Sequence, residues 1–379
     1  MARTWPLMAA ALLLAGCTAG DPVPRPSPPP AVVPTGVPTA DAAPQRLPFG
    51  AEPLWSTTDG KQNRVELAGD ALLTFRGDRL RVSDARTGAI RWSVSTGDPA
   101  PGGGTYSAPG SARVIGDPAR DWSVVTAYRD GGERGLIGLS GAGGDKLWRI
   151  PAGRTGDLSL GPATSRTATA VLTTAGRTRT VAYDLDTREQ AWTAAGVRPA
   201  AIQDDLVLVE RTGAKATLIA LDRETGKESW SLAARYPRSA LASTAGSTLI
   251  VDRGEGAAVV DTLTGRELTT WPARLTDCGS SATILACADT GAGPQDDQAV
   301  TITTVDDAAS VSTVPGSTGC RRLRVWEDLM YCSGPDGTAR AITTTGGTAD
   351  PGLPGIPEAI DARFAVFSDG TTLSVYAMS

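Results

Sequence analysis

The stretch Ala220-Leu-Asp222-Arg-Glu-Thr225-Gly226-Lys-Glu-Ser-Trp230 has the pattern of a β-hairpin tip whose second strand carries one large aromatic side chain. The apolar run before Asp222 predicts a strand, and the residues from Glu228 onward predict the next one. Asp222 can accept hydrogen bonds from backbone N–H groups two or three residues later, and Gly226 can adopt the left-handed conformation that closes such a turn. Strand alternation then directs Trp230 to one face of the sheet. A single hairpin is marginally stable at best, so this stretch predicts a fold only if similar hairpins occur elsewhere in the chain.

Near-copies of this stretch recur along the chain, and four of them keep the same eight-residue step to a tryptophan: 84–92, 140–148, 184–192 and 222–230. The third places Arg188 where the turn glycine is expected. A weaker copy at 261–265 has Thr269 at the tryptophan position and Trp271 two residues later, and 341–347 has the turn without an aromatic anchor. Self-similarity with a period near 40 residues is typical of propellers and solenoids.

The pattern Ala-x-Asp-x-x-Thr-Gly-Lys-x-x-Trp resembles the repeat of the pyrroloquinoline-quinone-like β-propellers. That superfamily includes quinoprotein dehydrogenases and the lipoprotein subunit of the outer-membrane barrel-assembly machinery. The resemblance covers residues 50–379 and is strongest at 84–92 and 220–230. It implies an all-β propeller of four-stranded antiparallel blades, and it leaves the function open.

Residues 49–379 form the predicted propeller, with room for eight blades of about 40 residues and seven as the alternative. Leu54-Trp55-Ser56 matches the outgoing strands of the copies, yet no hairpin precedes it. Residues 364–376 predict a hairpin with no outgoing strand after it. We therefore expect the N-terminal strand to complete the last blade, which closes the ring and removes an open sheet edge.

Residues 1–16 have the pattern of a lipoprotein signal peptide, with Arg3 before a short apolar run. Leu14-Ala15-Gly16-Cys17 resembles the bacterial lipobox, which implies cleavage before Cys17 and acylation of that residue. The alternative is an ordinary cleaved signal peptide with a chance cysteine. The apolar run is too short to span a bilayer.

Residues 17–48 are rich in proline and alanine and predict a semi-rigid spacer that buries nothing. No other long apolar segment occurs in the sequence. We therefore expect a propeller held at the cell membrane by the lipid on Cys17, facing the extracytoplasmic side.

Four further cysteines, an even number, suit an exported chain with disulfides: Cys278, Cys287, Cys320 and Cys332. Two local bridges, 278–287 and 320–332, are favoured over crossed pairings. A zinc site is the competing interpretation, but the spacing and the lack of histidine count against it.

The sequence contains no histidine, which excludes Ser-His and Cys-His nucleophile pairs and histidine-bound metals. Residues 141–146 are glycine-rich but lack the Gly-Lys-Ser/Thr ending of a phosphate loop. The acidic pairs 204–205, 296–297 and 306–307 could bind calcium, although such pairs more often cap turns. The basic run 321–324 could contact an acidic partner, although such a run is more often a solvated strand face, and the net charge of −5 argues against nucleic acid as a partner.

The tryptophan series is interpreted as packing between blades and not as a ligand platform. The sequence shows neither the adjacent cysteine pair nor the calcium-binding cluster of many quinoprotein dehydrogenases. Its arginine-, alanine- and glycine-rich composition looks like that of a high-GC actinobacterium, where the barrel-assembly machinery is absent. We predict a non-catalytic scaffold without a cofactor that binds an envelope or secreted protein. A ligand-sensing propeller is the alternative, and a dehydrogenase comes third.

Overall fold

The computed structural model describes residues 48–58, 62, 64–117, 120–211, 217–233, 241–253, 256–271, 275–289, 299–307, 310–347 and 353–379. The chain divides into two units, Met1–Asp41 and Ala42–Ser379, and all described residues belong to the second. The predicted signal peptide, Cys17 and nearly all of the predicted tether therefore lie outside the described residues. Among those that are described, no helix is long and apolar enough to cross a membrane.

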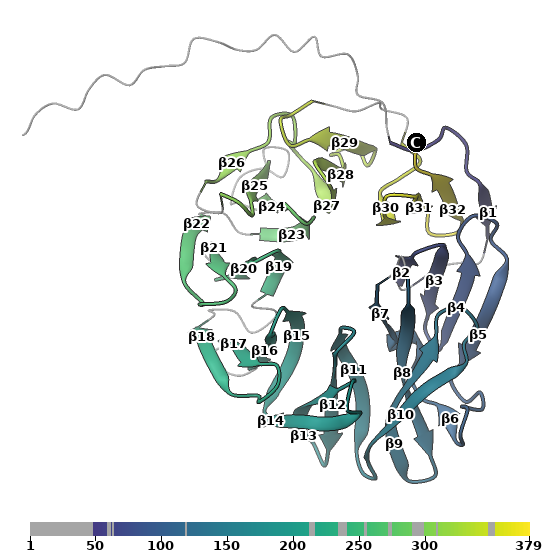
Figure 1. Ribbon diagram of the computed structural model, residues 1–379. Helices are drawn as coiled ribbons and strands as arrows, with labels where there is room; N and C mark the ends of the chain where they lie inside the picture. The colour runs from purple at the N-terminus through teal and green to yellow at the C-terminus, as the bar shows by residue number, and fades with distance from the viewer. Residues whose placement is uncertain are drawn as a thin grey trace, which may run out of the picture. The chain divides into compact units, whose positions relative to one another are not determined.

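Eight antiparallel sheets follow one another along the second unit and around a ring (Figure 1). Each has the strand that begins the blade toward the centre, except the second, where β7 (Arg113–Gly116) lies there and β6 (Thr105–Tyr106) lies farther out. The first four blades are β2 (Arg64–Ala68), β3 (Ala71–Arg76), β4 (Arg79–Asp84) and β5 (Ile90–Ser95); β6 (Thr105–Tyr106), β7 (Arg113–Gly116), β8 (Trp122–Asp130), β9 (Glu133–Ser140) and β10 (Lys146–Gly153); β11 (Asp157–Ala163), β12 (Thr167–Thr174), β13 (Arg177–Asp184) and β14 (Glu189–Ala195); β15 (Val197–Gln203), β16 (Leu206–Arg211), β17 (Thr217–Asp222) and β18 (Glu228–Ala233).

The other four blades complete the ring. They are β19 (Leu241–Ala245), β20 (Thr248–Asp252), β21 (Ala257–Asp261) and β22 (Glu267–Trp271); β23 (Leu275–Ser280), β24 (Ile284–Asp289), β25 (Val300–Thr304) and β26 (Ser312–Thr313); β27 (Arg321–Trp326), β28 (Leu329–Ser333) and β29 (Ala339–Thr343); β30 (Pro357–Ile360), β31 (Phe364–Ser368), β32 (Leu373–Ala377) and β1 (Trp55–Thr57). The prediction of an all-β, eight-bladed propeller is confirmed.

The prediction of four strands per blade holds for six of the eight. In blade 2, both β6 and β7 pair with β8, which makes five strands. A 3₁₀ helix, η1 (Pro109–Ser111), lies between these two short strands. Blade 7 has three strands among its described residues.

The apolar core is divided among the gaps between consecutive blades. The described residues form eight buried clusters, and each joins one blade to the next. This follows from strand alternation, because successive side chains of a strand face opposite neighbouring blades. In β3, for example, Leu72 packs toward blade 8 while Leu73 packs toward blade 2.

The ring closes as predicted, through the N-terminal strand. β1 pairs antiparallel with β32, and Trp55 lies opposite Val375. Phe49 adds a bridge to Met378 and packs its ring 5.1 Å from that of Phe367. The last blade is thus built from two ends of the unit that are far apart in sequence.

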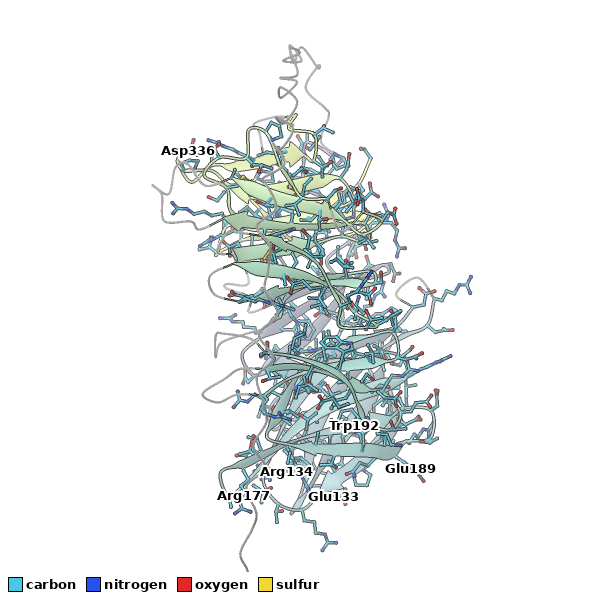
Figure 2. The ribbon with its side chains drawn as sticks, turned by 90° about the vertical axis from the view of Figure 1, so that its left-hand side faces the viewer. Glu133, Arg134, Arg177, Glu189, Trp192 and Asp336 are labelled. Atoms are coloured by element: carbon cyan, nitrogen blue, oxygen red, sulfur yellow. A yellow bond between two sulfur atoms is a disulfide. The ribbon has the colours of Figure 1, made fainter. Side chains whose placement is uncertain are left out.

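The turns of the blades gather on two opposite faces. Arg177 and Asp336, next to or within turns between second and third strands, lie on one side of the ring, and Glu189, after a third-to-fourth turn, lies on the other (Figure 2). The first-to-second turns share the second face, because Arg223 N–H donates to Asp205 O across 2.8 Å. We call these the 2–3 face and the 3–4 face.

Candidate functional site

The repeated aspartate holds the turn on the 3–4 face as the sequence predicts. In blade 4, Asp222 Oδ1 accepts hydrogen bonds from Thr225 N at 2.8 Å and from Thr225 Oγ1 at 2.6 Å. Gly226 closes the turn with φ +67°. The same geometry recurs at Asp84 and Asp261.

These three turns and the equivalent turn at Ser140 in blade 2 each receive a tryptophan from the preceding blade. Four indole N–H groups donate to the carbonyl of the residue after the turn-opening position: Trp55 to Ala85 at 2.8 Å, Trp92 to Gly141 at 3.0 Å, Trp192 to Arg223 at 2.8 Å and Trp230 to Thr262 at 2.8 Å. The indoles lie over the turn glycines Gly88, Gly144, Gly226 and Gly265. These four tryptophans therefore fasten one blade to the next.

Trp148 packs against the cluster between blades 2 and 3, as predicted, but it lacks the indole hydrogen bond to the next turn. The next turn carries Arg188, in the left-handed conformation with φ 61°, where the other turns have glycine. A Cβ at a docking glycine such as Gly226 would come within 2.6 Å of the incoming indole, so the side chain of Arg188 blocks the docking place. The Trp148 indole packs instead against Gly138 of its own sheet, and its N–H has no partner among the described residues.

Trp271, which follows the vacant anchor position at Thr269, is 1% exposed and packs between blades 5 and 6. Its indole N–H is buried and has no hydrogen-bond partner within the described part of the chain. It fills the gap between two blades without fastening them through a hydrogen bond.

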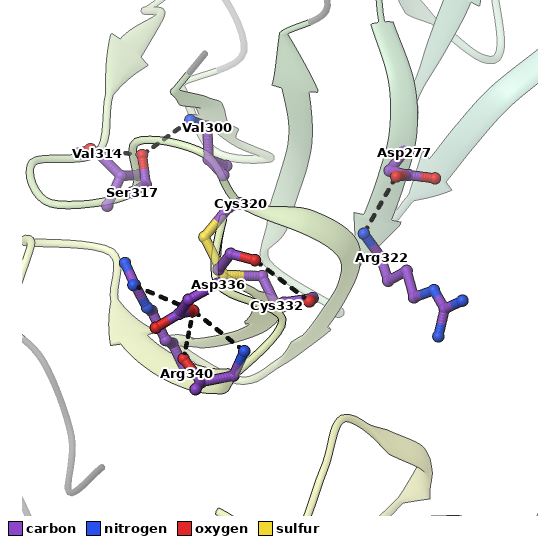
Figure 3. The surroundings of a disulfide bond; sticks show 12 residues. Asp277, Val300, Val314, Ser317, Cys320, Arg322, Cys332, Asp336 and Arg340 are labelled. Atoms are coloured by element: carbon purple, nitrogen blue, oxygen red, sulfur yellow. Dashed lines mark hydrogen bonds and ion pairs between the residues drawn. A yellow bond between two sulfur atoms is a disulfide. The ribbon is translucent and has the colours of Figure 1, made fainter. Parts of the chain in front are cut away.

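Both cysteine pairs are joined in the structure in the predicted combination, Cys278 with Cys287 and Cys320 with Cys332. The first lies directly across β23 and β24, and the second links the start of β27 to β28 (Figure 3). Cys287, Cys320 and Cys332 are buried between blades.

The acidic pairs remain parts of turns where they are described. Asp205 forms an ion pair with Arg223 at 2.8 Å, and the Asp307 carboxylate accepts the Ser310 hydroxyl. The pair at 296–297 lies outside the described residues. No cluster of three or more potential metal ligands occurs within the described ranges.

A cavity of about 860 Å³ lies on the 2–3 side of blades 6, 7 and 8. Its wall includes Asp277 of β23, Arg322 and Arg324 of β27, and Glu358 of β30. The remainder is formed by Gln62, by the 2–3 turns of blades 7 and 8 and by the approach to β30. First strands from three blades therefore bring charged groups to one space.

Arg322 reaches this cavity through a local irregularity in β27. The register between β27 and β28 shifts between Arg321 and Arg324, and Arg322 has φ 55°. The Arg322 N–H donates to Asp277 Oδ2 at 3.0 Å, while its guanidinium extends away from that carboxylate (Figure 3). The Asp277 carboxylate thus holds the backbone of Arg322, whose guanidinium has no ion-pair partner among the described residues.

Arg64, which also lies on the first strand of a blade, provides a comparison. Arg64 of β2 forms an ion pair with Glu66 at 2.8 Å and donates to the Ala112 carbonyl, and its guanidinium lies 3.8 Å from the ring centre of Phe75. Burial lowers the pKa of Arg64 and raises the pKa of Glu66. Those charges are paired within the protein, whereas the guanidiniums of Arg322 and Arg324 have no carboxylate partner in the described part of the chain.

Sequence reasoning found the arginine run but treated it as a solvated strand face, and it missed Asp277 and Glu358. The repeat pattern shows which residues share a strand, but it does not show which strands meet across the ring.

The fold resembles that of known β-propeller proteins. Residues 132–310 match the sequence model of the family described as outer membrane protein assembly factor BamB. BamB from Moraxella catarrhalis is 15% identical, with a TM-score of 0.52 over 86% of this chain and 99% of that one. Sqt1 from Saccharomyces cerevisiae is 11% identical, with a TM-score of 0.52 over 88% and 99%.

A quinohemoprotein alcohol dehydrogenase from Pseudomonas putida HK5 is 12% identical, with a TM-score of 0.48 over 88% of this chain and 78% of that one. No curated protein sequence matches the chain. At these identities the structural likenesses establish the fold and nothing about function.

Proposed function

We propose that this β-propeller, which resembles the pyrroloquinoline-quinone-like family, is a non-catalytic scaffold for a protein partner. The partner is an envelope or secreted protein, and the scaffold faces the extracytoplasmic side of the cell membrane. The matching family is described as an assembly factor, which supports a role in holding other proteins.

The observation that carries this proposal is how the repeats use their side chains. Four tryptophans fasten blade to blade, and the apolar residues fill the gaps between blades. The repeated residues therefore build a stiff ring and leave the turns on the two faces for recognition. Rigid frameworks that present variable loops are a common basis for protein binding.

The anchor rests on the sequence. Residues 14–17 match a lipobox, and the lipid on Cys17 followed by a proline-rich spacer would hold the ring near the membrane. Cys17→Ala should move the protein from the membrane fraction to the soluble fraction without changing its melting temperature. The distribution of the variant is measured by membrane fractionation and immunoblotting. Unchanged association with the membrane fraction would contradict lipid anchoring.

Partner binding can be tested by site-specific photo-crosslinking of the full chain in its native membrane. A photoreactive residue at Glu224 probes the 3–4 face, and one at Asp336 probes the 2–3 face. We expect one face to yield a discrete crosslinked protein while the other serves as the matched control. A lack of discrete products from either face would count against the scaffold role.

The second candidate is a ligand-binding propeller, which the 860 Å³ cavity favours because its volume lies in the range of small-molecule sites. The dehydrogenase alternative has no observation among the described residues in its favour.

A further inference from the structure

The cavity on blades 6 to 8 is held in a rigid frame. Asp277 and Ser333 of its wall each neighbour a disulfide-bonded cysteine, and Arg322 is two residues from a third. The Asp277–Arg322 hydrogen bond ties blade 6 to blade 7 at the same place (Figure 3). These links fix the backbone that carries the charged side chains, so the backbone loses little conformational freedom when a ligand binds.

Two of the charged groups are cationic and lack an anion. The guanidiniums of Arg322 and Arg324 have no carboxylate partner among the described residues, and Arg324 makes only a 3.4 Å hydrogen bond to the Leu323 carbonyl. A guanidinium binds a carboxylate through parallel hydrogen bonds, which makes it the preferred side chain for this task.

The wall is also acidic in part. Glu358 has no hydrogen-bond or ion-pair partner among the described residues, while Asp277 already accepts the Arg322 N–H. Asp369 is occupied as well, because the N–H groups of Thr372 and Thr371 donate to its carboxylate and lower its pKa to about 2. These acidic groups would repel a polyanion, so a ligand with both signs of charge is the better match.

We propose that this cavity binds a short peptide with free ends, with Arg322 and Arg324 on its terminal carboxylate and Glu358 on its amino group. The volume of about 860 Å³ suits a ligand of a few residues. This inference goes beyond the scaffold role and does not depend on it.

The test uses the full-length protein and a panel of free tripeptides Ala-Xaa-Ala, with binding measured by calorimetry. The C-terminal amides and the N-acetyl forms of the same peptides are the matched ligand controls. We expect amidation, or the double variant Arg322→Gln/Arg324→Gln, to weaken binding about 10- to 100-fold, since each removes a charge-assisted hydrogen bond. Glu358→Gln should weaken binding of the free peptides but leave binding of the N-acetyl forms unchanged.

Arg198→Gln is the matched protein control, because Arg198 is an exposed arginine on the first strand β15 that does not line the cavity. It should bind the panel like the unmodified protein, and all variants should melt at the same temperature. The proposal is overturned if no tripeptide binds or if binding survives the double arginine variant. It is also overturned if inorganic sulfate competes as well as the peptides, which would indicate a simple anion site.

Discussion

Asp84 shows how one carboxylate can organise a turn and its surroundings. Its Oδ1 accepts Thr87 N and Oγ1, both at 2.9 Å, and its Oδ2 lies 2.7 Å from Arg91 Nη2. Arg91 also pairs with Asp70 at 2.8 Å, so one guanidinium joins two turns of blade 1. The hydrogen bond from Arg91, followed by those from Thr87, lowers the pKa of Asp84 to about 2.

This depressed pKa predicts a dependence of stability on acid. Because the folded pKa lies below the ordinary value of 3.8, the stabilisation is present above about pH 4 and is lost as the pH falls toward about 2. Asp84→Asn should therefore lower the free energy of unfolding at pH 7, and the difference should shrink between pH 4 and 2 in denaturant titrations. A difference that stays constant over this interval would contradict the assignment, and Arg91→Gln should reduce the effect of Asp84→Asn.

The docking glycines provide a second test at the residue scale. Gly226 and Gly77 both have positive φ, +67° and +53°, but only a Cβ at 226 would meet the Trp192 indole. Gly77→Ala should cost about 1–2 kcal/mol of unfolding free energy from backbone conformation alone. Gly226→Ala should cost about 1–3 kcal/mol more because of overpacking. Equal losses in urea unfolding would show that the indole does not depend on this glycine.

At the scale of strands and hairpins, the disulfides reinforce the blades whose turn motifs are weakest. Blade 6 ends in the two-residue strand β26, and blade 7 has three described strands. In blades 1, 4 and 5, an aspartate turn receives a tryptophan from the preceding blade. The sequences of blades 6 and 7 lack this combination. Each disulfide joins two strands of a single blade, so it stabilises that blade internally and does not join neighbouring blades as a docked tryptophan does.

We predict that peptide mapping of the unreduced protein by mass spectrometry will yield the 278–287 and 320–332 linkages. With separations of 9 and 12 residues, each bridge should contribute about 2.5–3 kcal/mol in the loop-entropy description. Cys→Ala replacement of either pair should lower the melting temperature, whereas Cys17→Ala should not. A 287–320 linkage would refute the pairing.

The hairpins could be predicted from the sequence because turn chemistry and the anchor occur within about ten residues. The aspartate turns follow directly from such local patterns. The excursion through β6 and β7 could not be predicted, because it depends on two short strands that share one partner, β8. The cavity could not be predicted for a related reason, because Asp277, Arg322 and Glu358 come together only when three blades are assembled.

At the scale of the whole propeller unit, closure of the ring depends on the contacts of β1 with β32 in blade 8 and with the turn at Ala85 in blade 1. Trp55 pairs within blade 8 and donates its indole N–H to Ala85 of blade 1. Its partly buried ring also packs in the cluster between these blades. The same residue therefore completes one blade and fastens it to the next.

Two truncations should separate this role from that of the tether. Deleting residues 50–58 should lower the melting temperature strongly, because it removes a strand and the docked indole. Deleting residues 20–46, the matched control in the predicted spacer, should leave it almost unchanged. Trp55→Ala alone should cost about 2–3 kcal/mol, near the lower end for large aromatic side chains because the ring is only partly buried. Equal melting temperatures for the two truncations would place the closure elsewhere.

The pairing of β1 with β32 also makes folding depend on the order of synthesis. Ser56 and Ser374, whose hydroxyls lie 2.8 Å apart, are separated by 318 residues. A ribosome therefore makes β1 first and its partner strand last, and such long-range pairing is intrinsically slow. Until β32 emerges, Trp55 has its docking carbonyl at Ala85 but no strand beside it. An interrupted chain would keep this strand and indole uncovered, which gives proteases and chaperones a direct way to distinguish it from a finished ring.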